Sequence, residues 1–198
     1  DLTASGAVAF SDDGLPVMNS RVMRQALAAA ASSGGLVIDH CEDRALAEGG
    51  LMHEGPVAAH LGLAGIPSAA EEIMIARDII LAEALKARVH IAHLSTAGGV
   101  RIVGEARSRG VRVSAEATPH HLLLTDAALG SRDTNFKMNP PLRAESDVAA
   151  LVEAVRTGVV DVIATDHAPH TAEEKNRDFD KAPFGIVGLE TAVTLILD

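Results

Sequence analysis

The chain has 198 residues, of which 47% are hydrophobic and 22% are charged, a composition typical of a globular domain rather than a disordered segment. Its formal net charge is −10, and its 17 Lys and Arg residues form no basic stripe, which argues against a nucleic-acid-binding protein. No apolar run reaches the ~18 residues of a membrane span, so we expect no membrane partner and a cytoplasmic location. The single cysteine, Cys41, excludes an internal disulfide.

Short apolar, β-branched runs alternate with helical patterns along the chain. The runs lie near residues 7–11, 36–40, 89–93, 111–116 and 159–165, and the helical patterns cover 20–33, 69–86, 97–109, 146–157 and a last stretch from near Gly188. Runs that are apolar on both sides suit parallel strands covered by helices. The sequence therefore predicts an α/β protein with five β/α units, which favours part of a (β/α)8 barrel over a doubly wound sheet.

Local signals predict where the helices begin and end. Ser20 is the expected N-cap of the first helix, and Ser68-Ala-Ala-Glu71 has the spacing of a capping box for the second. Glycines follow three of the helical patterns, at Gly34, Gly110 and Gly158. The long polar stretch from Thr171 to Lys181 predicts a mobile loop over the site.

Acidic residues and histidines follow four of the five apolar runs, where each run ends. They are Asp13, His40, His93 and Asp166. Parallel strands place their carboxyl ends on one face, where barrel enzymes gather catalytic residues, and imidazole with carboxylate is a ligand set typical of zinc. The four residues are therefore a candidate metal cluster. Each alone also has a structural interpretation, as a turn residue for Asp13 and as a buried core histidine for His40 or His93.

Two further segments offer polar groups to a ligand. In Lys137-Met-Asn-Pro-Pro-Leu-Arg143, two prolines fix the backbone after Asn139, and a rigidly held amide both donates to and accepts from a ring amide. Pro183-Phe-Gly185 offers backbone groups, with a plain turn as the alternative. The pair His120-His121 fits loop structure as well as a ligand role.

Seven motifs, in order along the whole chain, resemble those of the long-chain bacterial dihydroorotases in the amidohydrolase superfamily. They are Phe10-Ser-Asp-Asp-Gly14, His40-Cys-Glu-Asp43, His93-Leu-Ser95, Glu116-Ala-Thr-Pro-His-His121, Lys137-Met-Asn-Pro-Pro-Leu-Arg143, Asp166-His-Ala-Pro-His170 and Lys181-Ala-Pro-Phe-Gly185. The resemblance implies a metal-dependent (β/α)8 (TIM) barrel, with residues 1–198 as a C-terminal portion of the catalytic domain and about its last five units. It implies reversible ring closure of N-carbamoyl-L-aspartate to L-dihydroorotate in pyrimidine biosynthesis.

The resemblance also implies metal ligands. One or two Zn²⁺ ions would be bound by Asp13, His40, His93 and Asp166. His40 and His93 match the histidines of the more solvent-facing metal, and Asp166 matches the acid that ligates the other metal and shuttles the proton. Asp13 stands where many relatives carry a carbamylated lysine, so the chain resembles the subgroup that uses an aspartate.

Substrate-binding positions follow from the same resemblance. Asn139 and His170 match side chains that contact the substrate, and Pro183, Phe184 and Gly185 match a backbone contact. The motif that contains Asn139 is the one that separates dihydroorotases from hydantoinases and allantoinases.

One family motif has no counterpart here, and it leaves alternatives open. The family begins its barrel with a His-x-His-x-Arg strand, which nothing in residues 1–198 matches, so we expect an excerpt of a longer enzyme. The alternatives are a hydantoinase or allantoinase, against which Asn139 and His170 argue, and an inactive scaffold subunit for aspartate carbamoyltransferase. The candidate partners are thus the small-molecule substrate, a second copy of the chain, and aspartate carbamoyltransferase.

Overall fold

The computed structural model describes residues 2–197, and its centre is a parallel sheet. The strands, in spatial order, are β1 (Ala9–Ser11), β2 (Leu36–Asp39), β5 (Val89–Ile91), β6 (Val113–Ala117) and β7 (Val162–Ile163). All four neighbouring pairs are parallel, and Val89 lies opposite Val37 on one side and Val113 on the other. A small second sheet, β3 (Met52–His53) with β4 (Gly65–Ile66), is inserted between β2 and β5. The predicted succession of five parallel β/α units is confirmed.

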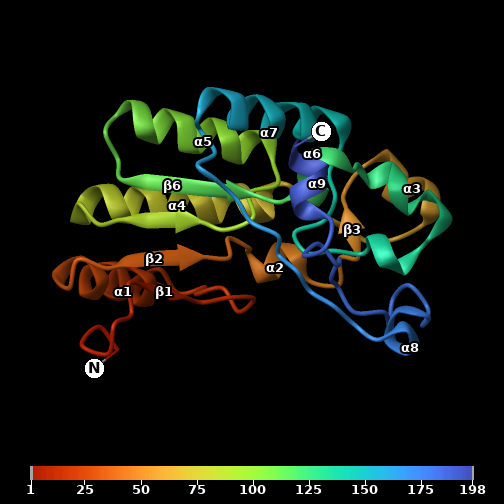
Figure 1. Ribbon diagram of the computed structural model, residues 1–198, viewed down its shortest axis with the longest axis horizontal. Helices are drawn as coiled ribbons and strands as arrows, with labels where there is room; N and C mark the ends of the chain where they lie inside the picture. The colour runs from red at the N-terminus through yellow and green to blue at the C-terminus, as the bar shows by residue number, and fades with distance from the viewer. Residues whose placement is uncertain (1, 198) are drawn as a thin grey trace.

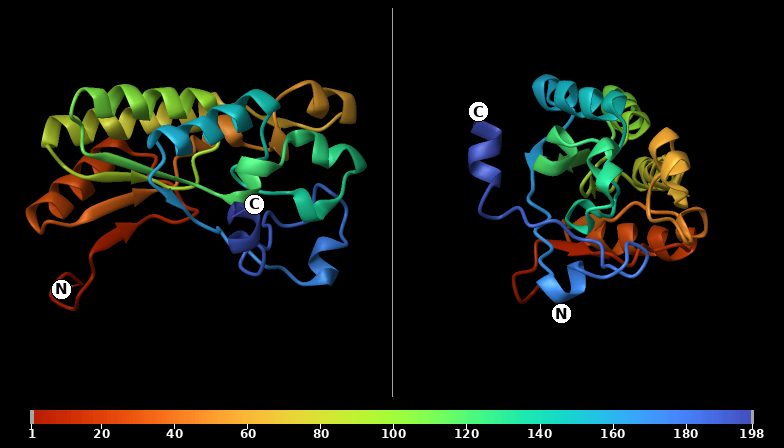
Figure 2. Two further views of the ribbon diagram at one scale, coloured as in Figure 1. Left: turned by 45° about the horizontal axis from the view of Figure 1, so that its top comes forward. Right: turned by 90° about the vertical axis from the view of Figure 1, so that its right-hand side faces the viewer.

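Four long helices cover one face of this sheet. They are α1 (Ser20–Ser32), α4 (Ala69–Leu85), α5 (Ala97–Ser108) and α7 (Glu145–Thr157). Each packs against the next, so that together they form an arc around the curved sheet (Figure 2). The core lies between the two layers, where strand residues such as Val89 and Ile91 and helix residues such as Leu27 and Ile75 are fully buried.

Shorter elements gather at the end toward which the strands point (Figure 1). They are α2 (Arg44–Ala47), α3 (Pro56–Leu61), α6 (Pro119–Leu123), the 3₁₀ helices η1 (Asp126–Ser131) and η2 (Thr134–Phe136), α8 (Ala172–Lys175) and α9 (Ala192–Leu197). The predicted site residues lie in loops, outside these short helices. None of the helices within residues 2–197 is long and apolar enough to cross a membrane.

One predicted N-cap, Ser20, and one predicted capping box, Ser68 with Glu71, are wrong. Asn19, not Ser20, caps α1, because its side-chain oxygen accepts hydrogen bonds from the backbone N–H groups of Arg21 and Val22 at 2.9 and 3.3 Å. Ser68 makes no side-chain cap bond, since its backbone is already helical, and Glu71 turns toward the loop after β5 instead. A capping box does form elsewhere, at the start of α8.

The last predicted strand and helix are shorter than the sequence suggests. β7 has two residues, and Val162 within it is 47% exposed. The last helix begins at Ala192, four residues after Gly188, and the Ala192 N–H donates to the Gly188 carbonyl at 2.9 Å. The stretch predicted as a mobile loop contains the short helix α8 and is hydrogen-bonded to the segment around Lys137.

Candidate active site

His40 and His93 meet at the carboxyl ends of neighbouring strands, β2 and β5. His40 Nδ1 lies 2.8 Å from His93 Nε2, and the ring centroids are 4.6 Å apart. Burial, and then the neighbouring His40, lower the pKa of His93 to about 3, so its ring is neutral near pH 7. Two imidazole nitrogens that face one another are a donor arrangement suited to a divalent metal ion.

Two residues at the strand ends have a left-handed backbone. His93 has φ 32° and Asp166 has φ 42°, values that are uncommon for residues other than glycine. Lys86 and Arg132 also have positive φ, but they are C-caps, where this conformation is ordinary. Since backbone strain away from caps persists only where the surroundings impose it, and clusters at functional sites, it marks His93 and Asp166 as candidates.

Asp166 is electrostatically connected to the other predicted ligands. Burial raises its pKa, the charges of Asp13 and Glu116 raise it further, and His40 lowers it. These groups therefore share one neighbourhood, although Asp13 is exposed in the loop after β1. The structure thus brings His40 and His93 into contact and places Asp166 and Asp13 within electrostatic reach.

A different trio, Asp39, Cys41 and Asp78, has its donor atoms within 4.8 Å of one another and is a possible metal-binding group. Cys41 Sγ donates to Asp39 Oδ2 at 3.0 Å, and Arg77 Nε donates to Asp78 Oδ1 at 2.7 Å. Burial and hydrogen bonding to Asp78 raise the pKa of Asp39 to about 9, and burial raises the pKa of the Cys41 thiol well above its usual value. A protonated acid, a neutral thiol and a carboxylate already paired with Arg77 are poor ligands. The trio fits a buried hydrogen-bonded support better than a metal site.

Glu116, for which the sequence predicts no role, lies on β6 and contacts residues of β5 and of the loop after it. Its Oε1 accepts from the His93 backbone N–H at 3.2 Å, and its Oε2 lies 3.0 Å from His90 Nε2. His90 Nδ1 in turn lies 2.8 Å from Ser114 Oγ. Glu116 therefore fixes the strained residue His93. Its position near the end of an apolar run is the same signal that singled out Asp166.

The side-chain amide of Asn139 uses only part of its hydrogen-bonding capacity. Its Nδ2 donates to Glu42 Oε2 at 2.8 Å, whereas its buried Oδ1 has no hydrogen-bond partner among residues 2–197. Next to it, the Pro140 carbonyl accepts from His121 Nε2 at 2.9 Å, which gives His121 a structural role. A buried carbonyl oxygen without a partner suits a ring N–H donor.

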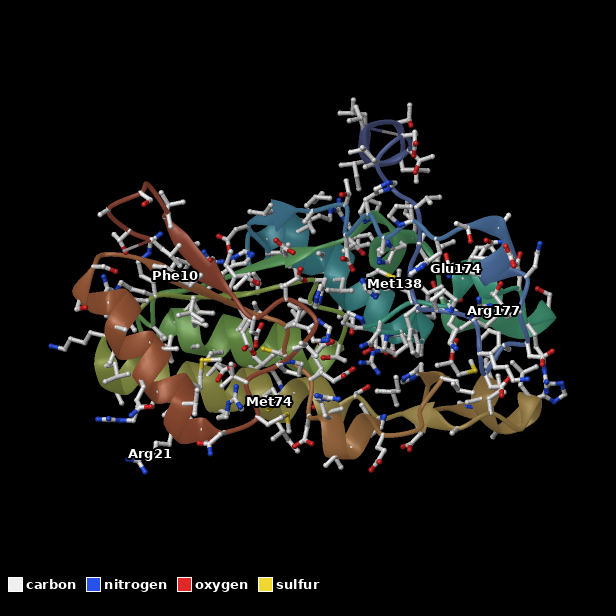
Figure 3. The ribbon with its side chains drawn as sticks, turned by 90° about the horizontal axis from the view of Figure 1, so that it is seen from below. Phe10, Arg21, Met74, Met138, Glu174 and Arg177 are labelled. Atoms are coloured by element: carbon white, nitrogen blue, oxygen red, sulfur yellow. The ribbon has the colours of Figure 1, made fainter. Side chains whose placement is uncertain are left out.

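The remaining predicted substrate positions lie together beyond β7. His170 Nε2 donates to the Phe184 carbonyl at 2.9 Å. A Cβ on Gly185, where φ is 151°, would lie 2.4 Å from the Ala168 carbonyl, so only glycine fits there. Figure 3 shows Met138, the neighbour of Asn139, beside the segment that carries Glu174 and Arg177. The predicted substrate positions thus come from two adjacent segments.

Comparisons with known proteins show which sequences this chain resembles. A family model described as dihydro-orotase-like matches residues 1–98. The dihydroorotase of Pelotomaculum thermopropionicum is 61% identical over 196 residues, which cover 99% of this chain but 46% of that relative. The chain therefore spans about half the length of the curated relatives it matches.

Solved structures show the same architecture. The dihydropyrimidinase of Brevibacillus agri NCHU1002 superposes with a TM-score of 0.82 at 27% identity, covering 99% of this chain and 46% of that one. Saccharomyces cerevisiae dihydroorotase, solved with 5-fluoroorotic acid, superposes with a TM-score of 0.71 at 19% identity, covering 90% and 48%, which supports the fold alone.

Proposed function

We propose that this chain, whose fold is part of the amidohydrolase (β/α) barrel, belongs to the dihydroorotase-like family and that the protein containing it is a dihydroorotase. The reaction is the reversible cyclisation of N-carbamoyl-L-aspartate to L-dihydroorotate. Residues 1–198 form a C-terminal portion of the catalytic barrel, and the protein works in the cytoplasm.

The observation that carries the proposal is the contact between His40 Nδ1 and His93 Nε2 at 2.8 Å, at the ends of adjacent parallel strands. The donor set fits a metal, since both rings are buried, the His93 ring is neutral, and Asp166 lies in the same neighbourhood. We assign His40, His93, Asp166 and Asp13 as ligands of one or two Zn²⁺ ions.

The metal would supply activation of water and polarisation of the ring carbonyl. The chain supplies the proton transfer. Asp166 has its pKa raised by burial and by neighbouring acids, which moves a carboxyl group toward the range useful for general acid–base chemistry at neutral pH. In the hydrolytic direction it accepts a proton from the attacking water and returns it to the departing ring nitrogen.

Substrate recognition falls to Asn139 and His170, with Pro183, Phe184 and Gly185 as backbone contacts. The free Oδ1 of Asn139 accepts a hydrogen bond from a ring N–H. The second candidate function is a hydantoinase-type reaction, which the 27% identical dihydropyrimidinase structure favours. The 61% identity to a dihydroorotase favours the first.

The test is kcat/KM for dihydroorotate, a hydantoin and allantoin in the complete protein and two variants. Asp166→Asn keeps the shape but removes the proton acceptor, so kcat should fall in both directions by about 10²–10⁴. Asn139→Ala should lower kcat/KM for dihydroorotate more than for the other rings, because unpaired buried groups set specificity.

Matched controls are Asp161→Asn, near the amino end of β7, and Asn135→Ala, on the exposed η2 turn. Both should keep turnover and substrate preference. A wild-type preference for hydantoin or allantoin would replace the substrate assignment. Inactivity of the wild type on all three rings, with metal bound, would favour the scaffold subunit for aspartate carbamoyltransferase.

A further inference from the structure

The segment from Lys137 to Arg143 contains a buried cation at each end, with Asn139 between them. Lys137 is 1% exposed and Arg143 is 2% exposed. A buried cation is costly unless its N–H groups are hydrogen-bonded, and Lys and Arg are rarely buried this completely. The partners of each cation therefore indicate what it does.

Arg143 reaches the loop that follows His93. Its Nε donates to Ser95 Oγ at 3.0 Å, and its guanidinium lies 3.7 Å from Glu71 Oε2. Glu71 in turn accepts from the backbone N–H groups of Ser95 and Thr96 at 3.1 and 3.0 Å, and from both of their hydroxyls. Arg143 and Glu71 together fix the two residues immediately beyond His93-Leu94.

Lys137 reaches the segment that precedes Pro183-Phe-Gly185. Its Nζ donates to the carbonyls of Phe179 and Ala182 at 2.6 and 2.7 Å, and lies 4.6 Å from the centre of the Phe184 ring. The Lys137 carbonyl accepts from the Gly185 N–H at 2.9 Å. The same residue thus holds this segment through both its side chain and its backbone.

A second lysine strengthens this attachment. Lys175, 8% exposed, donates from Nζ to the carbonyls of Thr134 and Pro183 at 2.9 and 3.0 Å. Both lysines are therefore used as hydrogen-bond donors to backbone carbonyls, a use that depends on geometry and not only on charge.

We propose that Lys137 and Arg143 are positioning residues that place two separate parts of the site relative to Asn139. Arg143, through Glu71 and Ser95, holds the loop of the ligand His93, and Lys137 holds the substrate-contacting backbone from Pro183 to Gly185. The proposal rests on the proposed function for the roles of those two parts. It predicts that the two cations have separable effects, one on metal retention and the other on substrate binding.

The test compares Arg143→Lys with Lys137→Met in the complete metal-loaded protein. Arg143→Lys keeps the charge but loses the forked geometry, and should weaken Zn²⁺ retention during dialysis by about 10–100-fold, the usual effect of losing a group that orients a ligand. Lys137→Met should retain metal, raise KM for dihydroorotate several-fold with little change in kcat, and speed amide exchange at Gly185.

The controls are Arg109→Lys and Lys181→Met, which alter exposed cations in surface ion pairs with Glu83 and Asp178. Both should leave metal retention, KM and exchange unchanged. Should Arg143→Lys fail to fold, Ser95→Ala removes the hydroxyl where Glu71 and Arg143 meet, and should still reduce metal retention.

The outcomes separate the two proposals. Wild-type metal retention in folded Arg143→Lys and Ser95→Ala, or wild-type KM and Gly185 exchange in Lys137→Met, would overturn the positioning role. Failure of the wild type to act on dihydroorotate would overturn the proposed function alone, because metal retention and amide exchange are measured without substrate.

Discussion

Two buried carboxyl groups on helix α4, Glu71 and Asp78, contact different strand ends and have different surroundings. Glu71 receives four hydrogen bonds from Ser95 and Thr96 and lies beside Arg143. Asp78 pairs with Arg77 but also faces Asp39, whose pKa is raised to about 9 by burial and by that neighbouring acid. Both acids are buried, but hydrogen-bond donors surround Glu71, whereas a second acid lies beside Asp78.

The largest expected effect comes from Glu71→Gln, which removes the carboxylate that lies within ion-pair distance of the buried Arg143. Removing one member of a buried ion pair costs about 3–5 kcal/mol, and we expect a loss of that size in the free energy of unfolding by denaturant titration. Glu83→Gln, on the same helix in the exposed pair with Arg109, should cost less than about 1 kcal/mol. Equal losses would show that the Glu71 network contributes no more than a surface pair.

The substitution Asp39→Asn tests the acids around Asp78 through the pH dependence of the free energy of unfolding. The folded pKa of about 9 exceeds the ordinary value of 3.8, so the stability that this proton contributes is full below about pH 4 and is lost as the pH rises toward 9. The wild type should therefore lose stability between pH 7 and 9, by at most about 1.4 kcal/mol per pH unit from this group. Asp39→Asn should lose less.

Between pH 7 and 9, the buried histidines do not contribute to the change in stability with pH. Burial lowers the pKa values of His93 and His121 to about 3, so their opposite contribution, a gain in stability with rising pH, is complete by then. The control is Asp178→Asn, whose exposed carboxyl has its pKa lowered by Lys181. A steeper decline in Asp39→Asn than in this control would contradict the assignment.

The sequence predicts the repeating parts of this molecule better than the contacts between them. The five β/α units follow from apolar periodicity, and His40 and His93 follow from their positions at run ends. The role of Glu71 does not, because Ser68-Ala-Ala-Glu71 fits a capping box locally, while the donors that attract Glu71 lie 24 and 25 residues away. Glu116 could have been predicted by the same reasoning, because it lies near the end of an apolar run. Lys137 and Arg143 could not, because their roles depend on packing between loops that no local pattern encodes.

The smallest expected effect concerns Cys41, which is 3% exposed with its thiol pKa raised by burial and by Asp39. Iodoacetamide at pH 8 should leave Cys41 unmodified in the native protein and modify it after unfolding, as measured by peptide mass spectrometry. Replacement by Ala should cost roughly 1 kcal/mol. Rapid labelling in the native state would mean that solvent reaches the cluster of Asp39, Cys41 and Asp78.

Helix α4 also constrains how the chain can vary in length. Glu71 and Asp78 are seven residues apart, close to two turns at about 3.6 residues per turn, so they share one helical phase. Inserting one residue between them would rotate one relative to the other by about 100° and separate it from its strand end. Insertions or deletions in α4 are therefore compatible with the site only outside residues 71–78. The fixed spacing of Glu71 and Asp78 along the helix keeps each of them in contact with its own strand end.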